Sequence, residues 1–190
     1  MNKSISTRRL AYLGLMTALV FASNYARIVM PVSIGGNTAF TLANIVCCLS
    51  GLILGPMGGL AAGLGSALYD ITNPIYAAEC WITFLTKGAM GLTAGLAAYA
   101  LMKKHPQRHP YAKYLTASIL GCCAYYVLYF LKTFLIAGLF AENGSAALGI
   151  AAIVSKIPAS VFNAAIAIIA APPLAIAVAR ALEKNHLSID

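Results

Sequence analysis

The chain has 190 residues, of which 61% are hydrophobic and only 9% charged, yet its formal net charge is +8 at pH 7. This balance is typical of an integral membrane protein whose positive charges lie at the lipid headgroups, and it argues against a nucleic-acid-binding protein. Because a helix needs about 20 apolar residues to cross a bilayer, six spans would use nearly all of residues 1–190. We expect these residues to form one domain. Little chain is then left for a nucleotide-binding domain, and the sequence contains no Walker-type motif.

The first half of the chain predicts three membrane helices. The first covers about residues 10–30, and the second and third cover about 40–54 and 57–69. A Gly-Pro pair separates the last two, because proline cannot continue the helical hydrogen-bond ladder. The third helix is short, so we expect it either to continue toward Pro74 or to end inside the membrane beside a cavity.

The second half predicts three more membrane helices. A turn-rich loop at 70–80 precedes the fourth helix, at about 81–101. The fifth covers about 111–140, which is long enough to require a tilt, a kink or an emergent end. The sixth covers about 149–178 and is expected to begin as a loop or re-entrant segment before Pro158. The predicted fold is therefore an all-α integral membrane protein with six transmembrane helices.

Most basic residues lie in three clusters, at the N-terminus, in one central loop and at the C-terminus. These residues are Lys3, Arg8, Arg9, Lys103, Lys104, Arg108, Lys113, Arg180 and Lys184. Basic residues that flank membrane spans are retained in the cytoplasm. We therefore expect both termini on the cytoplasmic side of a multi-pass membrane protein.

Small residues recur at every fourth position of the first predicted helix, at Gly14, Ala18, Ala22 and Ala26. Residues at this spacing share one helix face, and small side chains there allow another backbone to approach closely in lipid. A similar series of glycines runs through the second and third helices. Each series is explained either by packing between this chain's own helices or by contact with a partner protein.

Two segments carry a resemblance to a known family. They are TLANIVCCLSGLILGPMGGLAAGLGSALYD at 41–70 and WITFLTKGAMGLTAGL at 81–96, and they follow a basic N-terminus and a helix with the AxxxA stripe. This pattern resembles the substrate-binding S components of energy-coupling factor (ECF) transporters. The resemblance covers most of the chain.

The resemblance implies a six-helix subunit that captures a vitamin or similar micronutrient from outside the cell. It implies no ATPase activity of its own, but association with a transmembrane coupling protein and two cytoplasmic ATPases. The docking surface of the family corresponds here to Ala18 and Ala22, extended by Gly14 and Ala26. No enzymatic activity, cofactor or metal is expected.

Polar and aromatic residues near the outer ends of the helices are the candidates for binding the substrate, because aromatic rings stack on flat ligands and polar groups fix their orientation. The candidates are Asn24, Arg27, Asn37, Asn44, Tyr69, Asp70, Glu79, Trp81, Thr83, Lys87, Tyr125, Tyr129 and Asn163. Further candidates in the same stretches are Thr38, Asn73, Tyr76, Thr86, Lys132 and Lys156.

Four cations, Arg27, Lys87, Lys132 and Lys156, lie within or at the outer ends of apolar stretches, where a charge is costly. For Lys87 two explanations stay open: an ion pair with Asp70 or Glu79, or contact with an acidic or electronegative group of the substrate. Lys132 is interpreted as an anchor at the membrane interface.

Other functions are less well supported by the sequence. A self-contained carrier or channel would show repeats or pore-lining charge. An intramembrane enzyme would show a catalytic motif, and neither HExxH nor GxSxG occurs. Cys80 is interpreted as an unreactive thiol at the outer rim, and a role as a ligand of a metal or a corrinoid cobalt is the less favoured alternative.

Overall fold

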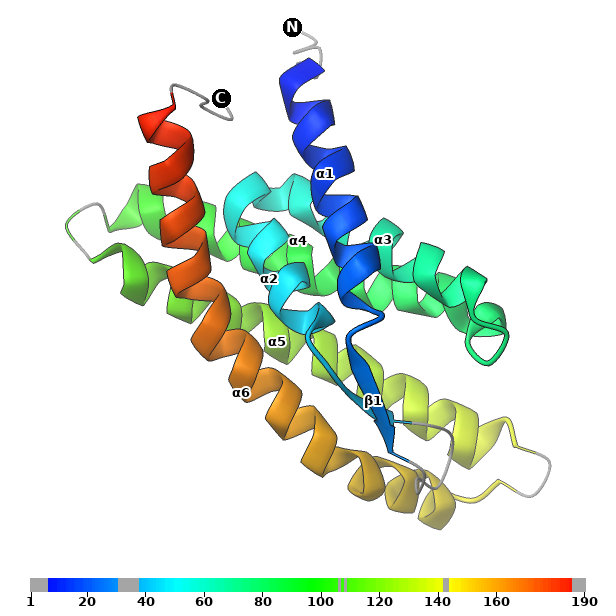
Figure 1. Cartoon of the computed structure of the whole chain (residues 1–190). Helices are drawn as coiled ribbons and strands as arrows, with labels where there is room; N and C mark the ends of the chain where they lie inside the picture. The colour runs from blue at the N-terminus through cyan, green and yellow to red at the C-terminus, as the bar shows by residue number, and fades with distance from the viewer. Residues whose placement is uncertain (1–6, 31–37, 106, 108, 142–143, 186–190) are drawn as a thin grey trace, which may run out of the picture.

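Helices make up most of the chain, as expected where the backbone has to satisfy its own hydrogen bonds within lipid (Figure 1). The computed structural model describes residues 7–30, 38–105, 107, 109–141 and 144–185. In chain order the elements are α1 (Thr7–Ser23), β1 (Arg27–Met30), β2 (Thr38–Thr41), α2 (Ala43–Leu54), η1 (Gly55–Met57), α3 (Gly58–Thr72), η2 (Ala77–Glu79), α4 (Cys80–Lys104), α5 (Pro110–Phe134), η3 (Leu135–Leu139) and α6 (Ala146–Lys184).

In the described part of the chain, three stretches are long and apolar enough to cross a membrane: Ala43–Thr72, Pro110–Leu139 and Ala146–Lys184. The first of them contains both α2 and α3. The chain turns between these helices at Gly55, whose φ of 63° favours glycine, and Ser50 Oγ donates a hydrogen bond to the carbonyl of Gly58 at 2.9 Å across the turn. A helical membrane protein is thus established, while six separate spans stay a prediction.

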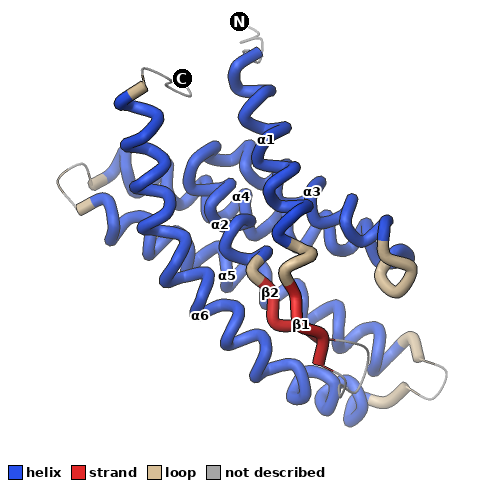
Figure 2. Tube along the Cα trace, viewed as in Figure 1, coloured by secondary structure: helices blue, strands red, loops and turns tan. Residues whose placement is uncertain are grey.

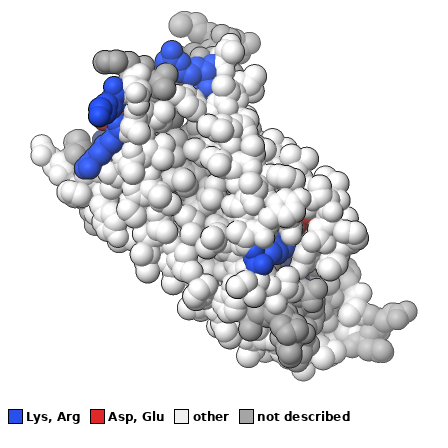
Figure 3. All heavy atoms as spheres, viewed as in Figure 1, with Lys and Arg blue, Asp and Glu red and all other residues white. Residues whose placement is uncertain are grey.

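The two ends of the molecule differ in charge. Figure 1 shows both termini and the α4–α5 connection at one end, and the strands with the α3–α4 and α5–α6 connections at the other. On the face drawn in Figure 3, most Lys and Arg atoms gather at the end that carries the termini. This arrangement agrees with termini on one side of the membrane. That this side is the cytoplasm stays a prediction.

A small β-hairpin interrupts the helices, so the prediction of an all-α fold is wrong in this region. β1 pairs antiparallel with β2, with Arg27 opposite Thr41 and Met30 opposite Thr38 (Figure 2). The first helix ends at Ser23 and not at residue 30, because the side chains of Ser23 and Asn24 both donate hydrogen bonds to the carbonyl of Val20. Such bonds compete with the continuing helical ladder.

α6 is one helix of 39 residues that passes through Pro158, Pro172 and Pro173. The predicted loop or re-entrant segment before Pro158 is therefore wrong. The helix already begins at Ala146, where Ser145 Oγ accepts a hydrogen bond from the backbone N–H of Leu148 at 3.2 Å. A transmembrane helix tolerates proline when neighbouring groups satisfy the freed carbonyls.

Glycines bring α3 and α4 into close contact. A Cβ added to Gly59 would lie 2.8 Å from the carbonyl oxygen of Gly88, and one added to Gly91 would lie 2.8 Å from that of Gly58. No side chain fits at these distances, so the two backbones pack directly on each other. The third helix also continues to Thr72, in agreement with its predicted extension toward Pro74.

Candidate functional site

A cavity of about 300 Å³ lies at the end of the bundle that carries the hairpin. The helices α3, α4, α5 and α6 and both strands contribute lining residues, and Asn24 lines the cavity from the turn that follows α1. The lining residues are Asn24, Arg27, Thr38, Ala39, Thr41, Asp70, Ile75, Tyr76, Glu79, Thr83, Thr86, Lys87, Tyr125, Tyr126, Tyr129, Lys132, Ile136, Lys156, Ser160 and Asn163. The volume is at the small end of the range for ligand sites, and the mixture of tyrosines with polar groups is typical of such sites.

Asn163 of α6 holds the hairpin over this cavity. Its Oδ1 accepts a hydrogen bond from the backbone N–H of Thr41 at 2.9 Å, and its Nδ2 donates to the carbonyl of Ala39 at 2.8 Å. Next to it, the rings of Phe40 and Phe162 meet edge to face at 4.8 Å between centroids. β2 is therefore fixed to α6 through both its backbone and its side chains.

Arg27 of β1 reaches the cavity over an aromatic platform. Its guanidinium carbon lies 4.3 Å from the ring centroid of Tyr69 and 5.2 Å from that of Tyr76. Its Nε donates to the carbonyl of Asn24 at 2.9 Å, and its Nη2 donates to the Oδ1 of Asn24 at 3.1 Å. These contacts fix the orientation of the guanidinium group before any ligand binds.

Lys87 of α4 lies at the inner wall of the cavity and is only 6% exposed. Its Nζ donates a hydrogen bond to the Oδ1 of Asn44 and lies 4.4 Å from the ring centroid of Tyr125. Asn44 also donates to the hydroxyl of Tyr126 at 3.1 Å. The contacts of Lys87 in the described structure are thus with neutral groups. The ion pair with Asp70 or Glu79, one of the two explanations left open, is not formed among these residues.

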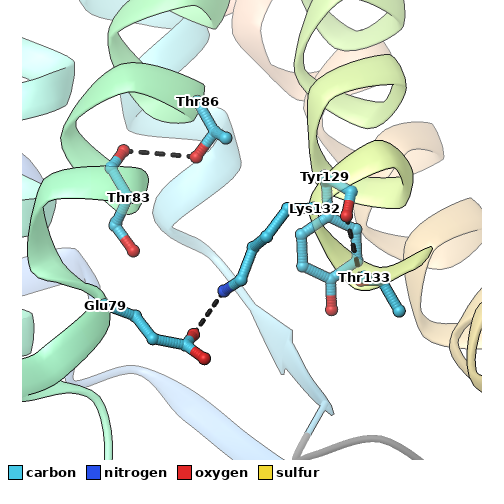
Figure 4. Close-up of polar contacts among 6 residues, drawn as sticks. All are labelled: Glu79, Thr83, Thr86, Tyr129, Lys132 and Thr133. Carbon is cyan, nitrogen blue, oxygen red and sulfur yellow. Dashed lines mark hydrogen bonds and ion pairs between the residues drawn. The ribbon is translucent and has the colours of Figure 1, made fainter. Parts of the chain in front are cut away.

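Lys132 of α5 extends across the cavity mouth and forms an ion pair with Glu79 (Figure 4). On the same helix face Tyr129 stacks on Tyr125, with ring centroids 5.7 Å apart, and Lys156 of α6 lies 5.6 Å from the Tyr129 ring centroid. The interpretation of Lys132 as an interfacial anchor is therefore wrong. The position of Lys132 near the end of α5 does not by itself show whether its side chain points into the cavity or toward the lipid headgroups.

Most of the predicted site residues meet at this cavity, but among the described ones Asn44, Tyr69, Asn73 and Trp81 do not line it. Asn44 and Tyr69 lie one layer behind, where they hold Lys87 and Arg27. Trp81 is 62% exposed on the outer surface of α4, and Asn37 lies outside the described residues. Cys80 belongs to no cluster of metal-ligating side chains within the described ranges. Whether the lining residues bind a substrate stays a prediction.

Sequence reasoning missed several lining residues, among them Thr41, Tyr126 and Ser160. A signal was present for Ser160, which follows Lys156 by four residues and precedes Asn163 by three, the spacing of one helix face. Thr41 had no such signal, because its position depends on the hairpin.

The stripe of small residues on α1 is exposed and borders a hollow between α1 and α3. Gly14, Ala18 and Ala22 are exposed, and a Cβ added to Gly14 would meet no atom within 4 Å. Gly14 and Ala18 line an apolar hollow with residues of α3. Ala26 lies beyond the end of α1, so it does not continue the stripe along the helix.

Comparisons with known proteins agree with this architecture. A solved structure described as the S component of a bacterial ECF transporter superposes with a TM-score of 0.59 at 16% identity, covering 95% of this chain and 98% of that chain. This likeness shows a shared fold. No curated protein matches the sequence.

The family described as "ECF-type riboflavin transporter, S component" matches residues 4–180. Its members are subunits of membrane transporters and not enzymes. The predicted resemblance is thereby confirmed over almost the whole chain: the protein belongs to the S-component family of ECF-type transporters, as a substrate-binding subunit.

Proposed function

We propose that this protein captures a vitamin-like micronutrient on the outer side of a prokaryotic plasma membrane and delivers it to an ECF module. The observation that carries the proposal is the cavity beneath the hairpin, at the end of the bundle remote from both termini. The three basic clusters support placing the termini in the cytoplasm. The cavity then opens toward the outside, where a scavenged nutrient arrives.

The ECF module consists, in this proposal, of a transmembrane coupling protein and two cytoplasmic ATPases. The exposed face formed by Gly14, Ala18 and Ala22 is the docking surface for the coupling protein. Small residues there leave the backbone of α1 open to a closely packed helix. Because the substrate cavity and this face involve different side chains, binding and docking can be disturbed separately.

Purification of the protein followed by mass spectrometry of small molecules that remain bound tests the binding role. We expect one compound to be retained without ATP, and radiolabelled uptake of it into cells only when an ECF module is co-expressed. Riboflavin is the first compound to examine, since the family is described by it. Transport into liposomes by this protein alone would instead indicate a self-contained carrier.

A further inference from the structure

The walls of the cavity carry more positive than negative charge. Of the residues that the structure describes, the cations Arg27, Lys87, Lys132 and Lys156 and the carboxylates of Asp70 and Glu79 line it, which leaves a formal surplus of two positive charges. Unlike the basic clusters near the termini, these groups lie within a small enclosed space. Charges in such a space are screened by water much less than charges on a surface.

The carboxylates do not neutralise this surplus. Glu79 is engaged by Lys132 at the cavity mouth. Asp70 is the other lining carboxylate, and it shares the cavity with both Arg27 and Lys87. Arg27 is held against Asn24 and two tyrosine rings, all of which are neutral.

Lys87 is the strongest indication of a negatively charged ligand. It is buried, and the groups that it contacts, Asn44 and Tyr125, are both neutral. An amide oxygen and an aromatic ring stabilise an ammonium group but do not cancel its charge. A buried cation usually has a counter-charge, and here the open side of the group is the cavity itself.

A second ammonium group approaches the same aromatic pair. Tyr125 and Tyr129 are stacked, with Lys87 over the first ring and Lys156 over the second. The cavity therefore offers ammonium groups from two helices beside these tyrosines, and flat parts of a ligand can pack on the exposed ring surfaces.

We infer that the substrate is a small organic anion, whose carboxylate or phosphate group binds between Lys87 and Lys156 beside the Tyr125–Tyr129 pair. This inference rests on the proposed function and narrows it. Riboflavin has no acidic group at neutral pH, so it lacks the part of the ligand that these lysines bind.

The first experiment uses inorganic phosphate and acetate as probes on purified protein that has been washed free of retained ligand. Thermal unfolding is measured at constant ionic strength, with chloride replaced by each anion. We expect phosphate or acetate to raise the unfolding midpoint of the wild type but not that of Lys87→Met. Lys103→Met is the matched control, since it removes the same charge from the exposed end of α4 and should respond like the wild type.

The larger of the two shifts tells whether the site prefers a phosphate or a carboxylate. An equal response of the wild type and Lys87→Met, or no response of the wild type to either anion, would overturn the inference. If Lys87→Met does not fold, Lys156→Met replaces it with the same expectation, because both lysines face the same tyrosine pair.

The second experiment identifies the compound that co-purifies with the protein and measures its affinity by calorimetry. We expect a compound with a negative formal charge at pH 7 and at least about tenfold weaker binding to Lys87→Met. Lys87→Arg should restore only part of the affinity, because the planar guanidinium is larger and directs its hydrogen bonds differently.

A neutral compound bound with unchanged affinity by Lys87→Met would refute the inference and leave the proposed function intact. If the wild-type protein retains no compound and supports no uptake together with an ECF module, the proposed function itself is refuted.

Discussion

The stripe on α1 and the glycines between α3 and α4 consist of the same kinds of residue at the same spacing, but their surroundings differ. Gly59 and Gly91 lie against the backbone of the facing helix, so any Cβ would collide with it. Gly14 and Ala18 face outward from the bundle. Small residues at helical spacing indicate that another backbone approaches. They do not tell whether that backbone belongs to the same chain.

Because their surroundings differ, we expect the two series of small residues to have different roles. The α3–α4 contact is part of the fold, and it brings Asp70 of α3 and Lys87 of α4 into the lining of one cavity. The α1 face takes no part in that contact and is free for a partner. Substitutions in the first region should therefore impair folding, and substitutions in the second should impair only what depends on docking.

The largest effect is expected for a leucine placed in the buried contact. A Cβ at Gly91 would lie 2.8 Å from the carbonyl oxygen of Gly58 and 3.0 Å from the Cα of Gly59. Gly91→Leu should abolish folding, because overpacking of this size forces the helices apart. Size-exclusion chromatography in detergent measures the folded fraction. Gly14→Leu is the matched control and should yield folded protein that still binds ligand, since open space surrounds that position.

A bulky ring on the exposed stripe should abolish uptake without weakening ligand binding. Ala18→Trp and Ala22→Trp place an indole where the coupling protein is expected to pack closely, at a distance from the cavity lining. Uptake by cells that contain the ECF module and calorimetry on the purified protein separate the two effects. Val127→Trp, at an exposed site on α5, is the control and should transport normally. If ligand binding disappears together with uptake, the stripe is part of the fold and the two regions do not differ in role.

The orientation in the membrane determines whether the cavity opens toward the outside, as the proposed function requires. We expect a membrane-impermeant maleimide to label Ala147→Cys on intact cells, and Gln107→Cys only after the cells are broken, in a background without native cysteines. These positions lie at opposite ends of the bundle, in the α5–α6 and α4–α5 regions. Labelling of both from outside would contradict cytoplasmic termini.

Much of the fold and the site could be predicted from local sequence. Apolar runs and the Gly-Pro pair gave helix positions close to those observed, while the six separate spans stay a prediction. Lys87 was recognised because a charge within an apolar helix is costly, and Asp70 and Tyr129 because polar and aromatic residues near the outer ends were expected to meet at one cavity.

The remaining features depend on contacts between distant residues. The apolar sequence of β1 continues that of α1, and only pairing with β2 shows that it is a strand. Trp81 and Lys132 were given the wrong environments, because the direction of a side chain depends on how its helix is rotated in the bundle. For the same reason, the supporting role of Asn44 under Lys87 was visible only in three dimensions.

The smallest expected effect comes from a single methyl group placed in each region. A Cβ at Gly59 would lie 2.8 Å from both the carbonyl oxygen of Gly88 and the Cβ of Leu92, whereas one at Gly14 would meet nothing within 4 Å. Gly59→Ala should therefore lower the thermal unfolding midpoint, at a cost of roughly 1–3 kcal/mol. Gly14→Ala should leave the midpoint unchanged or raise it, since alanine is favoured over glycine in a helix by about 0.5–1 kcal/mol.

Both methyl variants are measured by thermal unfolding in the same detergent, with ligand affinity as a second readout. We expect Gly14→Ala to keep the wild-type affinity, because no residue of α1 lines the cavity among the described residues. Uptake through the ECF module then reports how closely the coupling protein approaches Gly14, and a loss of transport in this folded, ligand-binding variant would support Gly14 as part of the docking surface. A midpoint lowered as much by Gly14→Ala as by Gly59→Ala would mean that α1 packs as tightly as α3, and the distinction between the two stripes would be lost.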